Sequence, residues 1–510
     1  MDRSTHAPDP TPRAGHTTAE EAFAGALVGV RPERGPAYEA ALDGARAAVL
    51  SRLWRALAFE PLPWVERREH RPGSLTLLLG GGRRLEGPAP DPYATGDRVD
   101  EVRLDGRPHR VAARLVEALR VPHGAAFAAE LDDSTASLAL SRAGQPTGPE
   151  PEPATTWEWE QRVVDGHPYH PNCRSRPGFS VAEQLAYAPE HRPVVTLGLV
   201  PVRAAEVLVN GDWPEHLRDG DRVLIPVHPW QAEHVLKGEG PLPGAAAHPL
   251  MALRTLAPVD GGPHVKTALS TRLTSSVRDI SGYSIETASV VSAFAEALTE
   301  RLDGRLHITR TLGAVTAHSP DLAAVLREPP EAYAGPGERV VPVAALAGTP
   351  LAGSAAWRAE FARLALSVCL RVLDLGVALE AHGQNLLVVL SAEGAPLRLV
   401  YRDLADIRIS PARLARHGLA APALAGRLVT DDETLLRRKL FGSLAAGALA
   451  ATAGSAAAFG ESLAAGLAAA PPTADTEALR AGPLPVKALT LMRLSPGVPG
   501  DQWADLPSPL

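Results

Sequence analysis

The spacing of hydrophobic residues predicts helices near both ends of the chain and short strands between them. Thr18 and Glu21 form a capping-box pattern before an Ala-rich stretch, which predicts a helix, and helical spacing continues to about Leu57. Beyond it, short apolar runs bounded by Gly, Pro or polar residues predict strands. These runs cover residues 75–79, 111–116, 194–200, 222–227 and 264–268.

After Gly353 the spacing changes to that of a long buried helix. Ser354 can cap this helix, and apolar residues recur every three or four positions until Gly376, a residue typical of helix ends. Two strands, at residues 386–390 and 397–401, and a mainly helical region follow. Taken together, the pattern predicts an α+β fold.

The chain is also predicted to contain several domains. Its 510 residues exceed the size at which a single hydrophobic core stops growing, about 250–300 residues. The Pro-rich, polar stretch 144–155 is the best candidate for a linker. We expect a disordered tail at residues 1–17, an N-terminal unit at 18–150, a middle unit at 151–340 and a C-terminal unit at 341–510.

Composition argues against several classes of protein. The formal charge of -7 and the lack of long Lys/Arg runs disfavour a nucleic-acid binder. Cys173 and Cys369 are too few for a disulfide scaffold, which favours a reducing cytoplasm. The N-terminus has no apolar segment typical of a signal peptide. The apolar stretch 443–470 is rich in Ala and Gly and contains Glu461, so we expect no contact with a membrane.

The first candidate site is a run of thirteen residues from His167 to Phe179, which we call the HP loop. Its sequence is His-Pro-Tyr-His-Pro-Asn-Cys-Arg-Ser-Arg-Pro-Gly-Phe. Two X-Pro steps hold the chain extended, so the loop presents its donors in a fixed order. The His-x-x-His-x-x-Cys spacing allows a zinc site, although no second Cys or His pair lies nearby in the sequence. A surface loop with incidental charges is the other alternative.

The second candidate site is a basic segment. It contains Arg254, Thr255, Lys266, Arg272, Thr274 and Arg278. We expect strands and turns to bring these groups into one hairpin, where fixed cations and hydroxyl groups suit a polyphosphate. A solvated basic strand face explains the same residues equally well. The sequence has neither a P-loop nor a Rossmann glycine pattern.

The third candidate site is Glu380 to Asn385, which we call the EH loop, together with Asp403 beyond two strands. Protein kinases hold magnesium between an Asn and an Asp in a similar order, so Glu380, Asn385 and Asp403 are candidate ligands of Mg²⁺. A kinase also has an Asp as base in this loop, whereas Gln384 stands here. An amide cannot accept a proton, which favours a nucleophile that is already ionised, such as a carboxylate.

In this order the three sites resemble the NRPS-independent siderophore synthetase family, also called the IucA/IucC family. The family's HPxHPxxKxRxGF signature is similar to the HP loop, with Arg174 where the family usually has Lys. Its ExHxQN motif resembles the EH loop. Its basic segment and its C-terminal Lys-Ala-Leu also have counterparts, the latter at Lys487, so the resemblance covers about residues 156–494.

The resemblance implies a multidomain cupped hand of thumb, fingers and kinase-like palm, with ATP between fingers and palm. The implied activity is adenylation of a di- or tricarboxylic acid, such as citrate, or of a siderophore intermediate. An amine or hydroxyl group then displaces AMP, so the products are an amide or ester, AMP and pyrophosphate. The implied ligands are ATP, Mg²⁺, a small carboxylic acid and an amine, and the implied assembly is a homodimer.

The resemblance also implies roles for single residues. ATP would contact His167, His170, Arg174, Arg176, Arg254, Thr255, Lys266, Arg278 and Gln384. The acid would contact Thr274, Arg278, His382 and Lys487. Lys266, Arg278 and His382 would act in catalysis, and Glu380, Asn385 and Asp403 would hold Mg²⁺. Two residues depart from the family pattern, since Arg174 replaces Lys and Ala252 stands where a Ser is expected.

Two other functions fit parts of the pattern. The EH loop and Asp403 would suit a small-molecule phosphotransferase of kinase-like fold, which Gln384 disfavours and which would form ADP in place of AMP. Ala252 and Arg174 would suit a non-catalytic module that binds ATP without turnover. The run that begins at His228, His-Pro-Trp-Gln, is a further candidate for ligand contact, with core packing as its alternative.

Overall fold

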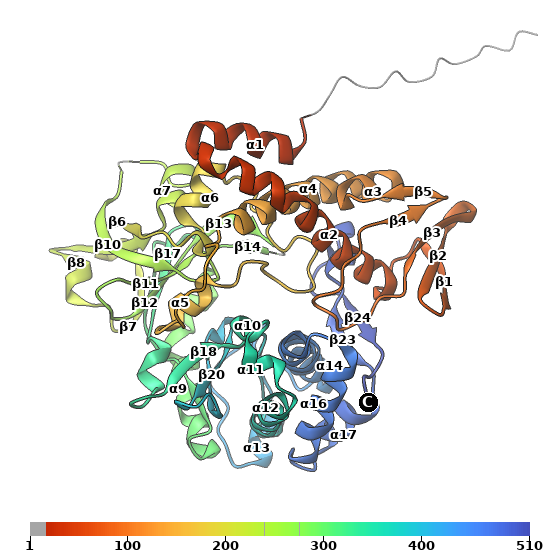
Figure 1. Ribbon diagram of the computed structural model, residues 1–510. Coiled ribbons are helices and arrows are strands. Elements are labelled where there is room, and N and C mark those ends of the chain that lie inside the picture. The colour runs from red at the N-terminus through yellow and green to blue at the C-terminus, as the bar shows by residue number, and fades with distance from the viewer. Residues whose placement is uncertain (1–16, 239, 275) are drawn as a thin grey trace, which may run out of the picture.

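The computed structural model describes residues 17–238, 240–274 and 276–510. Residues 1–16 of the predicted disordered tail lie outside the described residues. Figure 1 shows N-terminal helices with a small sheet, a large central sheet, and a C-terminal region in which helices surround a smaller sheet. The predicted mixture of helices and sheets is therefore confirmed.

The N-terminal region packs helices against an antiparallel sheet. Its helices are α1 (Ala19–Val30), α2 (Gly35–Phe59), α3 (Ala112–Leu119) and α4 (Gly124–Ala143). The sheet has its strands in chain order, β1 (Val65–Arg71), β2 (Ser74–Leu79), β3 (Arg83–Pro88), β4 (Val102–Leu104) and β5 (Arg107–His109). Trp54 of α2 is fully buried, and its indole N–H donates to Pro88 O of β3 at 2.7 Å, which ties the helices to the sheet.

Two local predictions in this region have opposite outcomes. The capping box before α1 is confirmed, because Thr18 accepts a hydrogen bond from Glu21 N–H while the Glu21 carboxylate accepts one from Thr18 N–H. The strand predicted at residues 111–116 is wrong, because this segment forms the start of α3. Buried Ala112, Leu115, Val116 and Leu119 follow the three-to-four spacing of one helix face. The six residues of the predicted run were too few to reveal that period.

The central sheet has the strand order β7-β16-β17-β12-β11-β10-β6-β9-β8. Its strands are β6 (Val195–Arg203), β7 (Leu208–Gly211), β8 (Arg218–Asp219), β9 (Arg222–Val227), β10 (Leu242–Pro249), β11 (Thr255–Pro258), β12 (His264–Thr267), β16 (Thr311–Thr316) and β17 (Ala323–Arg327). β13 (Leu269–Leu273) and β14 (Ser276–Arg278) form a separate hairpin. The neighbouring helices are α5 (Thr156–Gln161), α6 (Val181–Tyr187), α7 (Pro229–His234), α8 (Gly282–Glu286) and α9 (Ala288–Thr299).

The C-terminal sheet has the order β15-β21-β20-β18, formed by β15 (Leu306–Ile308), β18 (Arg339–Pro342), β20 (Leu386–Leu390) and β21 (Pro396–Tyr401). The helices of this region are α10 (Val343–Leu346), α11 (Pro350–Gly353), α12 (Ala355–Leu375), α13 (Pro411–Arg416), α14 (Glu433–Leu440), a π-helix (Phe441–Leu449), α15 (Ala450–Ala453), α16 (Ala456–Ala468), α17 (Ala474–Ala481) and α18 (Leu489–Leu494). Two short hairpins complete it, β19 (Val377–Ala378) with β22 (Arg408–Ile409), and β23 (Leu484–Lys487) with β24 (Trp503–Leu506).

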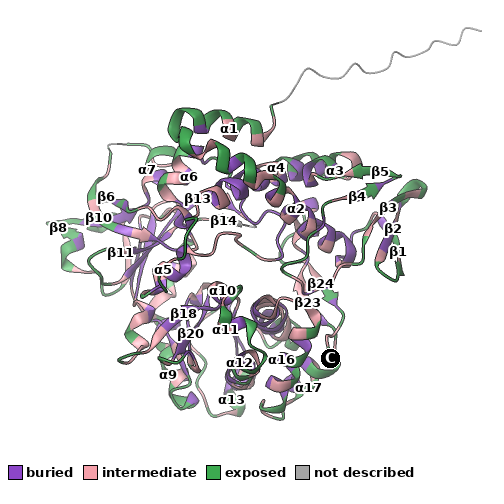
Figure 2. Cartoon of the chain, viewed as in Figure 1, coloured by how far each residue is buried: buried purple, intermediate pink, exposed green. Residues whose placement is uncertain are grey.

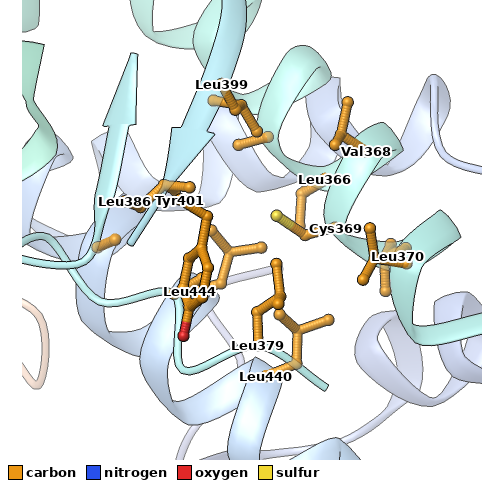
Figure 3. Packing of buried hydrophobic residues seen from close by; sticks show 14 of the residues in the cluster. Leu366, Val368, Cys369, Leu370, Leu379, Leu386, Leu399, Tyr401, Leu440 and Leu444 are labelled. Atoms are coloured by element: carbon orange, nitrogen blue, oxygen red, sulfur yellow. The ribbon is translucent and has the colours of Figure 1, made fainter. Parts of the chain in front are cut away.

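The predicted long helix is confirmed as α12 and forms the middle of the C-terminal core. The Ser354 hydroxyl accepts from Trp357 N–H at its start, and Gly376 ends it with a φ of 116°, which a residue without a Cβ adopts at little cost. Figure 3 shows side chains of α12 packed with those of the sheet and of the helices that follow, and Tyr401 lies among them. This core supports the EH loop and Asp403, which flank β20 and β21.

The end of the chain returns to the N-terminal region. Ala488, Leu491 and Leu494 are buried in the same hydrophobic cluster as α2 and α4. The Glu60 carboxylate after α2 accepts hydrogen bonds from the backbone N–H groups of Thr490 and Leu491. In Figure 2 buried residues line the inner faces of these helices, while α1 is mostly exposed. Across the described ranges, no helix has the length and apolar character needed to cross a membrane.

Candidate active site

A pocket lies between the central sheet and the C-terminal sheet, where the chain passes twice from one sheet to the other. The first crossing is the link at residues 309–310 between β15 and β16, and the second joins β17 to β18. The pocket is lined by Leu250, Ala252, Thr255, His264, Thr309, Arg327, Glu328, Pro330, Gln384, Asn385, Arg402 and Asp403. It therefore brings part of the predicted basic segment together with part of the EH loop and with Asp403.

Asp403 is the centre of charge in this pocket. Its Oδ2 lies 2.8 Å from Lys266 Nζ, and its Oδ1 lies 2.8 Å from Arg327 Nη2. Burial by itself would raise the pKa of this carboxyl group, but the two cations outweigh burial and hold the pKa well below its usual range. The backbone φ of Asp403 is 75°, a conformation that costs of order 1–3 kcal/mol for a residue with a side chain. The neighbouring contacts thus hold an ionised carboxylate in a strained backbone position.

The cations around Asp403 are crowded. Burial lowers the pKa of Lys266 to about 7, with help from Arg327 and Arg254 and against the attraction of Asp403. Burial and the charge of Arg278 lower the pKa of Arg254 to about 10. Burial is the main cause of both shifts, and it disfavours the charged forms. An anionic ligand in the pocket would favour the charged forms of these two groups.

The predicted single basic hairpin is wrong, because its residues belong to two hairpins. Thr255 and Lys266 face each other in the β11–β12 pair, whereas Arg278 faces Leu269 in the β13–β14 pair. The side chain of Arg254 joins the two hairpins, since its Nη1 donates to the carbonyl oxygens of Arg278 at 2.5 Å and Asp279 at 2.6 Å. The break falls at Ala268, the one residue between β12 and β13, after which a separate sheet begins.

The EH loop is held closed by its own backbone. His382 N–H donates to Glu380 O, and Asn385 N–H donates to His382 O at 2.9 Å. Asn385 Nδ2 also donates to Glu380 O at 3.3 Å, which leaves the Oδ1 atom of this amide as the group offered to the pocket. An amide oxygen and the Asp403 carboxylate in one pocket are donors of the kind that Mg²⁺ prefers, so these two residues fit the predicted metal.

Glu380, the third predicted metal ligand, has other neighbours and does not line the pocket. Its Oε1 lies 3.2 Å from Lys439 Nζ and 3.2 Å from Lys487 Nζ. Lys487 was predicted to contact the acid, and it also pairs with Asp501. Glu380 and Asp501 raise the pKa of Lys487 against the effect of burial, so its ammonium group stays charged.

The HP loop is more deeply buried than its sequence predicts. Arg174 and Arg176 are buried, and both form ion pairs with buried Glu190, at 3.6 and 2.8 Å respectively. Arg174 also donates to the carbonyl oxygens of Val163 and Val164. Burial would raise the pKa of Glu190, but the two guanidinium groups outweigh it and keep the carboxylate ionised. These contacts anchor the loop inside the protein, and none of the three residues lines the pocket.

Three predicted site histidines share one hydrogen-bond pattern. A backbone N–H donates to Nδ1 of His167, of His170 and of His382, at 3.0 to 3.2 Å. An accepting Nδ1 assigns the hydrogen of the neutral ring to Nε2. Burial lowers the pKa of all three rings, to about 3 for His167. Each ring therefore offers a neutral Nε2–H donor, and buried Nε2 of His170 has no partner within the described residues.

Comparisons with known proteins show which proteins this chain resembles. The sequence profile of the IucA/IucC family matches residues 155–348, and the profile described as ferric iron reductase FhuF-like transporter matches residues 355–496. A curated relative in Staphylococcus aureus (strain NCTC 8325 / PS 47), 2-[(L-alanin-3-ylcarbamoyl)methyl]-3-(2-aminoethylcarbamoyl)-2-hydroxypropanoate synthase, is 26% identical over 389 residues, 60% of this chain and 62% of that protein. Over residues 155–348 the chain is thus similar to the IucA/IucC family.

A second curated relative is citryl-spermidine/3,4-dihydroxybenzoyl-citryl-spermidine:spermidine ligase of Bacillus anthracis. It is 26% identical over 310 residues, 48% of this chain and 50% of that protein. The matches thus span about half to three fifths of the length of these two relatives. The activity of the whole chain is therefore a proposal.

Two solved structures share the fold of this chain. Petrobactin biosynthesis protein AsbB from Bacillus anthracis str. Sterne superposes with a TM-score of 0.77 at 18% identity and covers 94% of this chain and 98% of its own. ATP-bound aerobactin synthetase IucA from a hypervirulent pathotype of Klebsiella pneumoniae superposes with a TM-score of 0.70 at 20% identity, over 91% and 99%. Both likenesses extend across nearly the whole chain, including its N-terminal region.

Several residues at the site carry no local sequence signal. Arg327 pairs with Asp403 because β17 lies beside β12 in the sheet, with His264 facing Arg327. Arg402 lines the pocket and pairs at 2.7 Å with Glu160, which lies far away in the sequence. Thr309 lines the pocket with a buried hydroxyl that has no partner within the described residues. Arg327 could have been identified from the register of β12 and β17, because no local motif marks it.

Among the other predicted residues, His228 shares the tautomer and the lowered pKa of the site histidines, and it does not line the pocket. Trp230 N–H donates to its Nδ1 at 3.1 Å, and burial lowers its pKa to about 3. The Trp230 ring stacks on Phe179 with ring centroids 4.9 Å apart. This run therefore packs against the end of the HP loop, as the core-packing alternative predicted.

Proposed function

We propose that this protein is an ATP-dependent ligase that adenylates a carboxylate of a small polycarboxylic acid and joins it to an amine or hydroxyl group. The observation that carries the proposal is the pocket lined by Asn385, ionised Asp403 and Arg327, with Lys266 paired to the Asp403 carboxylate behind it. Buried cations beside oxygen donors suit a polyphosphate with Mg²⁺. The likeness to ATP-bound aerobactin synthetase IucA supports the same nucleotide here.

The names of the relatives support the acid class. One is a citryl-spermidine ligase and another is the D-ornithine–citrate ligase of Staphylococcus aureus. In our proposal the acid is a di- or tricarboxylate of the citrate type, or an intermediate that contains one, and the product belongs to siderophore or related biosynthesis. Arg278, Thr274, His382 and Lys487 bind the acid. Cationic groups and a neutral N–H donor suit a ligand with several carboxylates.

Two bonds form and two break in the proposed reaction. A carboxylate oxygen attacks the α-phosphorus of ATP, and pyrophosphate leaves. The nucleophile then attacks the carbonyl carbon of the acyl-adenylate and loses a proton, and AMP leaves with the carboxylate oxygen. Lys266 and Arg254 offset the repulsion between carboxylate and phosphates, while His170 and His167 donate hydrogen bonds to phosphate oxygens. The Nε2–H donors take no proton from the amine, since Nδ1 already accepts a backbone N–H.

Mg²⁺ held by Asn385 and Asp403 would offset part of the phosphate charge. Arg278, Thr255 and Gln384 complete the proposed contacts to ATP. In this proposal Arg174 and Arg176 hold the HP loop in place and do not contact ATP themselves, because both are paired with Glu190. The homodimer also belongs to the proposal.

The finer architecture is proposed as a cupped hand. Residues 18–150 form a thumb, residues 151–340 the fingers, and residues 341–510 a kinase-like palm. The pocket between the central and C-terminal sheets supports ATP binding between fingers and palm. The packing of Ala488 to Leu494 against α2 and α4 supports a close connection between palm and thumb.

The test is a product analysis with a panel of di- and tricarboxylic acids and hydroxylamine as a general nucleophile. We expect a hydroxamate, AMP and pyrophosphate in equal amounts, dependent on one of the acids. ADP as the sole nucleotide product would support the phosphotransferase alternative and would sink the proposal. Binding of ATP without any product across the panel would support the non-catalytic alternative.

A further inference from the structure

Charged side chains of alternating sign extend from the EH loop to the C-terminal segment. Lys439 Nζ lies 2.6 Å from Asp406 Oδ2 and 3.2 Å from Glu380 Oε1. Lys487 Nζ lies 3.2 Å from the same Glu380 oxygen and 3.2 Å from Asp501 Oδ2. Two ammonium groups therefore share one carboxylate oxygen. Lys439 has no part in the site that the sequence predicts.

Lys439 is placed by the end of α14 and the π-helix that follows. Its side chain is only 4% exposed, so its charge is little screened by solvent. Ser443 Oγ of the π-helix lies 2.6 Å from Lys439 O and 3.4 Å from Leu379 O, next to Glu380. A Cβ on Gly442 would lie 3.0 Å from Pro485 O, two residues before Lys487. The same segment thus contacts both the loop that carries Glu380 and the strand that carries Lys487.

The two carboxylates bound by Lys439 differ in what else neutralises them. Asp406 also pairs with Arg408 at 2.9 Å and with Arg427 at 3.7 Å. Among the ion pairs of the described residues, Glu380 has Lys439 and Lys487 as its cations. Without Lys439, Asp406 would still be neutralised by its two arginines. Glu380 would then have Lys487 as its remaining cationic partner among the described residues. Lys487 is 33% exposed and is the member of this group assigned to the acid.

We propose that Lys439 is a positioning residue for the acid substrate, because it shares the Glu380 carboxylate and so leaves the Lys487 ammonium group available to a substrate carboxylate. In this role Glu380 is the counter-ion that orients Lys487, and Mg²⁺ is held by Asn385 and Asp403 without it. This inference rests on the proposed function, and it explains how the subsite for the acid keeps a positive charge.

The test measures binding of the acid by calorimetry with neither ATP nor Mg²⁺, using the acid found in the product screen. For Lys439→Met we expect the dissociation constant of the acid to rise about tenfold, the size of one charge-assisted hydrogen bond. Binding of ATP alone should change less than twofold. Lys439→Arg keeps the charge and should restore most of the acid affinity. Lys237→Met removes an exposed charge outside this group and serves as the matched control.

A double variant separates this role from simple damage to the fold. Glu380→Gln combined with Lys439→Met removes the carboxylate that would otherwise occupy Lys487, so acid affinity should return towards that of the unmodified protein. A double variant as weak as Lys439→Met would overturn the inference, as would unchanged acid binding by Lys439→Met. If the unmodified protein activates an acid and Lys439→Met changes only its Mg²⁺ requirement, the counter-ion role is wrong and the proposed function stands. If the unmodified protein activates no acid, both fail.

Discussion

The HP loop and the pocket around Asp403 contain similar residues but use them differently. Each has two closely spaced cationic side chains directed at one carboxylate, Glu190 in the first case and Asp403 in the second. Glu190 has no exposed side-chain surface, whereas Asp403 is 26% exposed and lines a pocket. The same pairing therefore serves as an internal anchor in one place and as an open charged surface in the other.

The difference shows why a count of basic residues is a poor guide to a phosphate site. A guanidinium group whose carboxylate partner is fully enclosed has little charge left for a ligand. A cation beside a carboxylate at a pocket wall can pair with that carboxylate and also bind an anionic ligand in the pocket. The exposure of the shared carboxylate thus distinguishes the two regions, and substitutions at each should have different consequences.

The largest expected effect lies at the pocket. Arg327→Gln leaves Asp403 with Lys266 and removes one fixed positive charge from the pocket. We expect kcat/KM for ATP to fall by about 10²–10³-fold, as on removal of one preorganised stabilising group. Acid-dependent pyrophosphate release measures it, with Arg222→Gln, an exposed strand residue, as the control. An undiminished rate would show that the pocket is not where ATP reacts.

The next effect lies at the HP loop and concerns stability. Glu190→Gln leaves Arg174 and Arg176 buried without a counter-ion, which should lower the free energy of unfolding by about 3 kcal/mol. Urea denaturation measures the loss. Glu150→Gln breaks the more exposed pair with Arg192 and should cost under about 1 kcal/mol.

The folded fraction of Glu190→Gln should retain the kcat of the unmodified protein. If the variant instead keeps its stability and loses ATP affinity, the arginines of the HP loop act on the ligand directly and the contrast between the regions disappears.

The smallest effect is the pH dependence of stability that the buried histidines confer. Burial lowers the pKa of His167 and of His228 to about 3, below the value of about 6.5 in an unfolded chain. The unfolded state therefore binds protons first, so stability falls as pH decreases from about 6.5 towards 3. Between pH 6.5 and 5.5 each such histidine should cost about 1 kcal/mol.

Urea denaturation at pH 7.5, 6.5 and 5.5 measures this slope, and His228→Gln should make it shallower. Glu60 has the opposite effect on stability as pH decreases, because burial raises its pKa to about 7 and the folded state therefore binds its proton first. Equal or greater stability at pH 5.5 would contradict the neutral state of the histidines.

Local hydrogen-bond patterns made part of the fold predictable. The capping box of Thr18 and Glu21 and the helix from Ser354 to Gly376 depend on residues close in sequence, and both are confirmed. The segment at residues 111–116 is a helix, because six residues do not distinguish an apolar helix face from a strand. The basic segment forms two hairpins because a new sheet begins after β12, which side-chain type alone does not reveal.

In the candidate site, too, only the residues that belong to local motifs could be predicted from the sequence. Thr255, Gln384, Asn385 and Asp403 were predicted from motifs and line one pocket. Arg327 and Lys439 depend on sheet register and on helix packing between distant segments, so no local pattern identifies them. Their pairing with Asp403 and Glu380 emerges only once the chain has folded.

The most direct measurement of the proposed activity follows an oxygen atom. The acid found in the product screen would be labelled with ¹⁸O in its carboxylates, and the nucleotide product analysed by mass spectrometry. Adenylation predicts one ¹⁸O in each AMP formed, because the carboxylate oxygen that attacks phosphorus leaves with AMP. Unlabelled AMP, or label found in ADP or inorganic phosphate, would contradict an acyl-adenylate.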